Sequence, residues 1–233
     1  MRSFHEQVMY VLVTAITNVA YVPVALTLLR QGRDFEAFVA FFTTLTSFMY
    51  HLCDSVQRSV WMTAGQWHRL DNIGSIMAFS CWFIYLARFR DPRVSDRVKY
   101  TFLMLILICQ EKGPWDERFT FGPILTAAAI FLIRLLLFNS WMAKVRWRRR
   151  TLTVGLGLLV LAVLSFIRGL DDATDPYRIF HGGWHFFGGV SSYYLWQVKR
   201  DVDVAEQQSV VDGGHGSPSF RRGTGVETSS HNV

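Results

Sequence analysis

The sequence predicts an all-α membrane protein, a bundle of seven transmembrane helices with the N-terminus outside and the C-terminus in the cytosol. Two observations support this fold class. Hydrophobic residues make up 51% of the 233 residues, and the mean hydropathy is +0.21 although a polar C-terminal segment lowers it. The apolar residues also form long blocks instead of the stripes of a soluble domain. A helix needs about 20 such residues to cross roughly 30 Å of hydrocarbon.

Seven apolar blocks follow one another along the chain. The first is too long for the core of a signal peptide and no small-residue cleavage site follows it, so we expect it to remain as a helix. The third, fifth and sixth blocks are also long and strongly apolar. The fourth is short, and the seventh (F-H-G-G-W-H-F-F-G-G-V-S-S-Y-Y-L-W) is rich in glycine and histidine. The predicted spans are about 8–29, 36–52, 70–89, 98–111, 121–138, 152–168 and 180–198.

Lysine and arginine are distributed unequally between the two sides of this predicted bundle. The loops after the first, third and fifth helices, with the stretch after the seventh, carry 14 of them, and the opposite side carries 7. Basic loops stay in the cytosol, so this bias sets the orientation stated above. Residues 1–200 form the predicted membrane domain. Residues 201–233 are rich in Gly, Ser, Asp and Val without periodicity, which predicts a disordered cytosolic tail.

The formal net charge of +6 does not indicate a nucleic-acid-binding protein. The basic residues lie in short clusters between apolar blocks, not on one face interleaved with aromatic residues. We expect them to contact anionic lipid headgroups instead. The three cysteines, Cys53, Cys81 and Cys109, are too few for a disulfide framework and define no redox compartment.

Several ionisable residues fall inside the predicted spans, where they are costly unless they pair in the bundle interior. They are His51 at the end of the second span, Asp71 at the start of the third, and His181 and His185 at the start of the seventh. With alternating helix directions, all of these positions lie at the outer face. Ser47 lies one turn deeper than His51. The topology therefore predicts a polar cluster at one membrane level.

The spacing of these residues is consistent with a metal site. Ser47 and His51 are four residues apart, as are His181 and His185, so each pair lies on one helix face about 6 Å apart along the axis. A third imidazole from another helix completes a three-histidine set, which on zinc leaves a fourth position for water, as in catalytic sites. Asp71 could then orient or deprotonate this water, and Ser47 could donate a hydrogen bond to developing negative charge.

Each residue also has a plainer interpretation. A histidine near a helix end is more often a snorkelling or capping residue than a ligand, and H-G-G-W-H lacks the glutamate of the zincin motif. Asp71 could simply cap a helix. His68 is expected in an interfacial loop, the glycine pairs at 182–183 and 188–189 in close helix packing, and Arg134 has no predicted partner. The cluster of acidic residues further along predicts a solvated outer loop and not a calcium site: Asp171, Asp172 and Asp175.

Taken together, the motifs resemble one known family. S-F-M-Y-H-L-C-D (47–54), D-N-I-G-S (71–75) and H-G-G-W-H (181–185) are similar to the membrane domain of the myomaker and transmembrane-protein-eight family. E-K-G-P-W-D-E-R-F-T-F-G-P-I (111–124) is similar to its loop into the fifth helix. The resemblance covers about 36–198. It places the chain in the CREST superfamily, with the alkaline ceramidases and the progestin and adiponectin receptors.

This resemblance implies a seven-helix bundle with an intramembrane zinc ion, and amide or ester cleavage of a lipid in the hydrolytic members. The superfamily's shared residues fall on Ser47, His51, Asp71, His181 and His185. The three histidines would bind zinc, Asp71 would act as base or orient water, and Ser47 would support the oxyanion. Residues 201–233 contain no cysteine, unlike the acylated tail of myomaker, which argues against a fusion role of that kind.

We therefore expect a zinc-dependent hydrolase of a lipid amide or ester, in the plasma membrane or the endomembrane system. The expected partners are membrane lipids and a lipid substrate, with no nucleic acid, and a homodimer stays open. The alternative is a non-catalytic protein in membrane remodelling, cell fusion or receptor signalling, whose zinc or His/Asp network pins helices. A transporter is a third alternative, but it would need ionisable groups at several depths, and only Arg134 and Glu111 suggest this.

Overall fold

The computed structural model describes residues 2–114, 116–137, 148–171 and 173–198. In this part of the chain the regular elements are helices, and the only β-type pairing is a single bridge between Val60 and Met62. The fold is therefore all-α, as predicted. The predicted tail, 201–233, lies outside the described residues.

Each predicted span overlaps a helix or a continuous run of helical segments. The first span is the run from Phe4 to Arg30. The elements are α1 (Phe4–Tyr10), η1 (Val11–Ala15), η2 (Ile16–Tyr21), α2 (Val22–Arg30), α3 (Asp34–Val56), α4 (Ala64–Leu86), α5 (Pro92–Lys112), α6 (Glu117–Leu137), α8 (Arg149–Arg168), η3 (Pro176–Arg178) and α9 (Ile179–Leu195).

Three of these helical stretches are long and apolar enough to cross a membrane: Phe4–Arg30, Glu117–Leu137 and Arg149–Arg168. Their outward faces are strongly apolar, with Leu136 77% exposed on α6 and Val160 58% exposed on α8. A water-soluble protein rarely exposes such continuous apolar surface. These helices indicate a membrane protein, while seven crossings and the orientation stay predictions.

Most helices begin or end beyond the predicted apolar spans, because polar caps continue them. Thr63 and Gln66 form a capping box at the start of α4, and Asp91 caps α5, whose first residue is Pro92. At the end of α3, Gln57 adopts a left-handed conformation with φ 54°. Helix α4 therefore starts at Ala64, which places His68 in a helix and not in the predicted loop.

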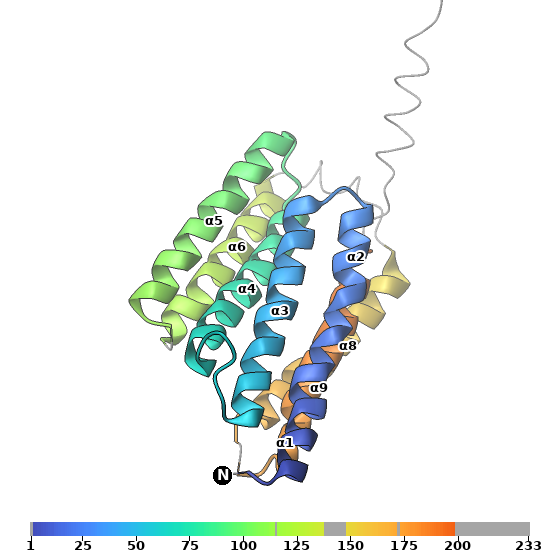
Figure 1. Ribbon diagram of the computed structural model, residues 1–233. Helices are drawn as coiled ribbons and strands as arrows, with labels where there is room; N and C mark the ends of the chain where they lie inside the picture. The colour runs from blue at the N-terminus through green and yellow to red at the C-terminus, as the bar shows by residue number, and fades with distance from the viewer. Residues whose placement is uncertain (1, 115, 138–147, 172, 199–233) are drawn as a thin grey trace, which may run out of the picture. The chain divides into compact units, whose positions relative to one another are not determined.

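The helices that carry the predicted site residues lie in the middle of the bundle. Helix α4 packs between α3 and the α5–α6 pair, whereas α9 packs between α8 and the N-terminal helical run (Figure 1). The backbones of α3 and α9 do not pack closely against each other within the described ranges. Side chains from both helices therefore have space to meet between them.

Two glycines allow α9 to approach the N-terminal run closely. A Cβ atom on Gly189 would lie 2.7 Å from the backbone of Ala20, and one on Gly182 would collide with the carbonyl oxygen of Val13. This run changes from π-helix to 3-10 helix at residues 15–16, directly opposite α9. The predicted role of the glycine pairs in close packing is thus confirmed for Gly182 and Gly189.

Charged residues pair at the end of the bundle where α3 and α5 begin. The carboxylate of Glu36, whose side chain is only 3% exposed, lies 2.8 Å from Arg33 and 3.1 Å from Lys99. The Arg33 guanidinium also lies over the rings of Tyr85 and Trp196, 3.9 and 4.6 Å from their centroids. This group joins α3, α4, α5 and the end of α9 at the opposite end of α3 from His51.

Arg134, for which the sequence suggested no partner, closes the end of α4. Its Nε donates to the carbonyl oxygen of Ala87 at 2.6 Å and its guanidinium donates to that of Arg88 at 3.0 Å. These carbonyls follow the last turn of a helix, where they lack intrahelical donors. Glu111 in turn pairs with Arg69 at 2.7 Å. Both residues suggested for a transporter thus have contacts between helices instead.

Candidate metal centre

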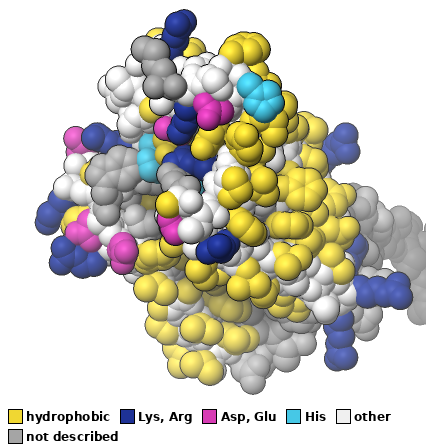
Figure 2. Space-filling view, turned by 90° about the horizontal axis from the view of Figure 1, so that it is seen from below, with side chains coloured by type: hydrophobic (Ala, Val, Ile, Leu, Met, Phe, Trp, Pro, Cys, Tyr) yellow, Lys and Arg dark blue, Asp and Glu magenta, His cyan; other side chains and the backbone are white. Residues whose placement is uncertain are grey.

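The predicted site residues come from three helices that meet at one end of the bundle. Ser47 and His51 lie in the second half of α3, Asp71 lies in the first half of α4, and His181 and His185 lie in the first turns of α9. Helix α3 ends where α4 and α9 begin, near the N-terminus of the chain (Figure 1). Figure 2 shows this end, where charged side chains and histidines gather beside a broad hydrophobic region.

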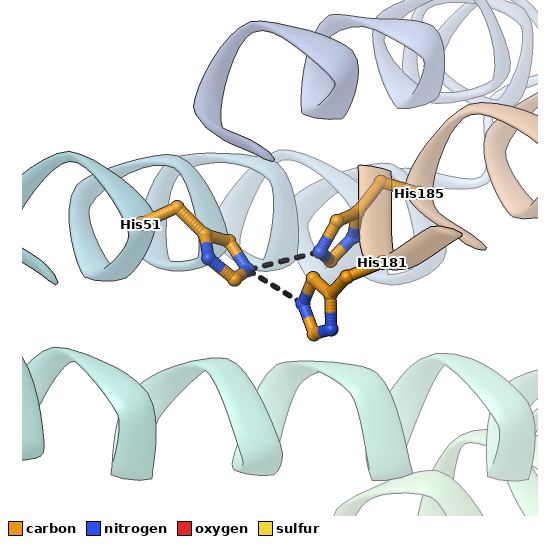
Figure 3. A group of neighbouring side chains, drawn as sticks. All are labelled: His51, His181 and His185. Atoms are coloured by element: carbon orange, nitrogen blue, oxygen red, sulfur yellow. Dashed lines mark hydrogen bonds between the residues drawn. The ribbon is translucent and has the colours of Figure 1, made fainter. Parts of the chain in front are cut away.

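The three histidines point their rings toward one another (Figure 3). The Nε2 atom of His51 lies 2.9 Å from Nε2 of His185 and 3.3 Å from Nε2 of His181. One ligand atom from each of the three rings lies within 4.8 Å of the other two. His51 is thus the link between α3 and the histidine pair of α9, and this cluster could bind a metal ion.

The geometry and donor set fit zinc. Two ligands held by tetrahedral zinc at about 2.0–2.1 Å lie about 3.4 Å apart, which compares with 3.3 and 2.9 Å for the two Nε2–Nε2 separations that involve His51. Each neutral imidazole has only one N–H and one lone pair, so three converging Nε2 atoms cannot satisfy one another fully by hydrogen bonds. A cation accepts all three lone pairs. The cluster is also buried, with His51 1% and His185 6% exposed.

The ring of His51 packs against neighbouring aromatic rings. Its Nδ1 is buried and has no hydrogen-bond partner within the described residues. The Tyr50 ring lies 4.5 Å from the His51 ring, centroid to centroid, and stacks on His68 at 4.1 Å with nearly parallel planes. This histidine–tyrosine stack beside the cluster was not expected from the sequence.

Ser47 and Asp71 form a second polar layer, one helical turn deeper than His51. The Ser47 hydroxyl is buried and lies within reach of the Asp71 carboxyl, although no hydrogen bond of ordinary geometry satisfies it in the described part of the chain. Ser75 donates to Asp71 at 3.4 Å. Asp71 is not one of the side chains whose ligand atoms converge.

The prediction that Asp171, Asp172 and Asp175 lie in a solvated loop is wrong for Asp175. Asp175 is only 1% exposed, and its carboxylate accepts hydrogen bonds from the backbone N–H groups of Phe180 and His181. Asp171 is exposed, as predicted, and Asp172 lies outside the described residues. Hydropathy gives no indication of such a capping contact. The signal in the sequence is the position of Asp175 shortly before α9, where a carboxylate can cap the helix.

Residues 6–186 match the model of a family described as a protein of unknown function, DUF3522. The chain belongs to this family. The matched range contains every residue of the predicted site, both of the metal cluster and of the deeper polar layer. The family's description assigns no activity to it.

Curated relatives include Transmembrane protein 8B of Homo sapiens, which is 26% identical over 229 residues. This match covers 94% of the chain and 45% of the relative. The proteins of the same name from Bos taurus and Mus musculus are 26% identical over 207 residues, covering 84% of the chain and 43% of each relative. The chain thus spans less than half the length of these relatives. The predicted resemblance to the transmembrane-protein-eight family is confirmed, whereas CREST membership stays a prediction.

Proposed function

We propose that this chain is a multi-pass membrane hydrolase of the CREST type that uses zinc to cleave an amide or ester bond of a lipid. The observation that carries the proposal is the convergence of His51, His181 and His185 next to the Ser47–Asp71 layer. Three nitrogen ligands leave a coordination position open, which is the arrangement of catalytic and not of structural zinc sites.

The protein groups have complementary roles in this reaction. Zinc would supply Lewis-acid activation of the scissile carbonyl and of water. The Asp71 carboxylate would orient the attacking water, take its proton and return it to the leaving oxygen or nitrogen. The Ser47 hydroxyl would donate a hydrogen bond to the carbonyl oxygen as negative charge develops there. The Ser47 hydroxyl is buried beside the Asp71 carboxyl, which supports this role.

A lipid substrate is supported by the surroundings of the cluster. Trp184, the residue before His185, lies with its ring centroid 5.2 Å from Phe166 of α8 and 6.5 Å from Phe79 of α4. These rings form an apolar contact between α4, α8 and α9, next in sequence to the ligand candidate His185. An acyl chain would be buried against these rings while its polar linkage reaches the histidines.

The proposal includes seven crossings, with the N-terminus outside and the C-terminus in the cytosol, in the plasma membrane or the endomembrane system. The 14-to-7 distribution of basic residues between the two sides supports this orientation. The metal cluster would then lie near the outer or lumenal surface, within reach of lipids of that leaflet.

Turnover tests the proposal. The full chain, purified in detergent, would be incubated with a total membrane lipid extract, and released fatty acids measured by mass spectrometry. We expect Asp71→Asn to lower the rate at least about 100-fold, the scale of general base catalysis, with zinc content unchanged. Asp96→Asn is the matched control, because this carboxylate is 56% exposed at the other end of the bundle. Wild-type-like release by Asp71→Asn would overturn the catalytic assignment.

A non-catalytic role is the second candidate, and the burial of His51 and His185 favours it. Zinc would then pin α3 to α9, as in closed structural sites, and the function would lie in membrane remodelling, cell fusion or receptor signalling. The two candidates differ in one observable. Lipid profiles of cells with the wild type and with Asp71→Asn would be the same for a structural site and different for an enzyme.

A further inference from the structure

The turn between α8 and α9 contacts the first residues of α9, the helix that carries His181 and His185. Asp175 lies in this turn, and its two carboxylate oxygens accept from the N–H groups of Phe180 and His181 at 3.0 and 3.1 Å. The N-cap residue of α9, Arg178, makes no side-chain capping bond. Asp175 therefore takes over the capping of a helix whose first turns carry two of the three histidines.

Arg178 fixes the same turn to the helix of the third histidine. Its guanidinium lies 3.2 Å from the Asp54 carboxylate, with only 16% of the Arg178 side chain exposed. Asp54 follows His51 by three residues, so both lie on neighbouring positions of one face of α3. The ion pair therefore joins the part of α3 that carries His51 to the residue from which α9 starts.

The backbone of the turn adopts a conformation that surrounding contacts must hold. Tyr177 and Arg178 both have positive φ values, 55° and 57°, which cost energy in residues other than glycine. The Tyr177 ring packs edge-on against Tyr10 at 6.0 Å between centroids. On the other side, a Cβ atom on Gly169 would lie 2.8 Å from the backbone nitrogen of His181. The backbone of His181 is thus enclosed by the end of α8 and by the Asp175 carboxylate.

We infer that Asp175 is a positioning residue for the metal centre: by binding two backbone N–H groups at the start of α9, it sets the height and rotation at which His181 and His185 face His51. This inference rests on the proposed metal site. Asp175 contacts the ligand candidate His181 through the backbone N–H group of His181 and not through its imidazole ring.

Zinc affinity of the full purified chain tests this role, measured by competition with a chromophoric chelator. We expect Asp175→Ala to weaken zinc binding by about three- to thirty-fold, the loss that corresponds to removal of a helix cap. Asp175→Asn keeps one acceptor oxygen and should recover most of the affinity. Asp171→Ala is the matched control, since among the described residues the Asp171 carboxylate accepts from Ala173 and Thr174 of its own loop, and it should bind zinc like the wild type.

Hydrogen exchange of the amides at residues 179–182 separates failure of this inference from failure of the proposed metal site. If the wild type binds no zinc, the proposed metal site is wrong. If amide exchange at residues 179–182 is also unchanged in Asp175→Ala, the positioning role is wrong as well. If the wild type binds zinc and Asp175→Ala binds it equally tightly, only the inference is overturned. Should Asp175→Ala not fold, Asp175→Ser, with its single shorter acceptor, replaces it in both measurements.

Discussion

Ser47 is the residue whose environment most directly suggests chemistry. Buried hydroxyl groups in folded proteins are nearly always hydrogen-bonded, and an exception needs a physical reason. Ser47 lies on the same face of α3 as His51, beside Asp71, and its oxygen lacks a partner of good geometry in the described chain. In the proposed reaction this hydroxyl would donate to the substrate oxygen.

Replacing Ser47 by alanine tests this interpretation. We expect Ser47→Ala to lower kcat by about 10²–10³-fold with little change in zinc content, because one donor to the developing oxyanion is removed. Ser80→Ala is the matched control: Ser80 is also buried and unpartnered among the described residues, but it lies more than two turns further along α4 than Asp71. Equal kcat values for both variants would exclude an oxyanion role for Ser47.

The sequence predicted the residues of the cluster but not the residues around it. His51, His181 and His185 were expected to lie together because ionisable groups at membrane depth are costly and because two of them are four residues apart. Asp175 was predicted to be solvated, and Arg134 had no predicted partner. Both bind backbone groups of another segment, and such contacts depend on how helix ends meet in space.

At the scale of the helices, hydropathy located the centres of all seven predicted segments but not their ends. Helix α4 begins at Ala64, six residues before the predicted start, because the Thr63–Gln66 capping box continues it through polar sequence. Similarly, α3 begins at Asp34 and includes Glu36, whose charge is satisfied by Arg33 and Lys99. Hydropathy averaged along the sequence excludes polar and charged residues from a span, although ion pairs and helix caps stabilise them in a helix.

Glu36 provides a stability prediction for the contact between α3 and α5. Removing one partner of a buried ion pair leaves the other charge uncompensated, which costs about 3–5 kcal/mol. We therefore expect Glu36→Ala to lower the unfolding temperature of the full chain in detergent by several degrees more than the control variant does. Asp96→Ala is the control, because it also pairs with Lys99, at 3.0 Å, but is 56% exposed, and exposed pairs contribute about 0–1 kcal/mol. Equal shifts in the two variants would contradict a structural role for the buried pair.

At the scale of the whole membrane domain, the predicted topology places the metal cluster at the outer face. A flexible Gly/Ser insertion with an Asn-X-Thr acceptor, long enough to hold the acceptor away from the bilayer, tests this directly. We expect glycosylation when the insertion follows Arg58, between α3 and α4, because that loop lies at the cluster's end of the bundle. The same insertion after Arg90, between α4 and α5, should remain unmodified. The reverse pattern would place the site at the cytosolic face.

The central claim is that α3 and α9, whose backbones do not pack closely against each other, share one metal ion through His51, His181 and His185. Elemental analysis of the full chain, purified without chelators, measures this most directly. We expect about one zinc ion per chain in the wild type and in His68→Ala, and roughly a tenth or less in His51→Ala and His185→Ala. His68 is a suitable control because it lies beside Tyr50 at the same end of the bundle but outside the cluster. Equal zinc in all four proteins, or none in the wild type, would contradict the claim.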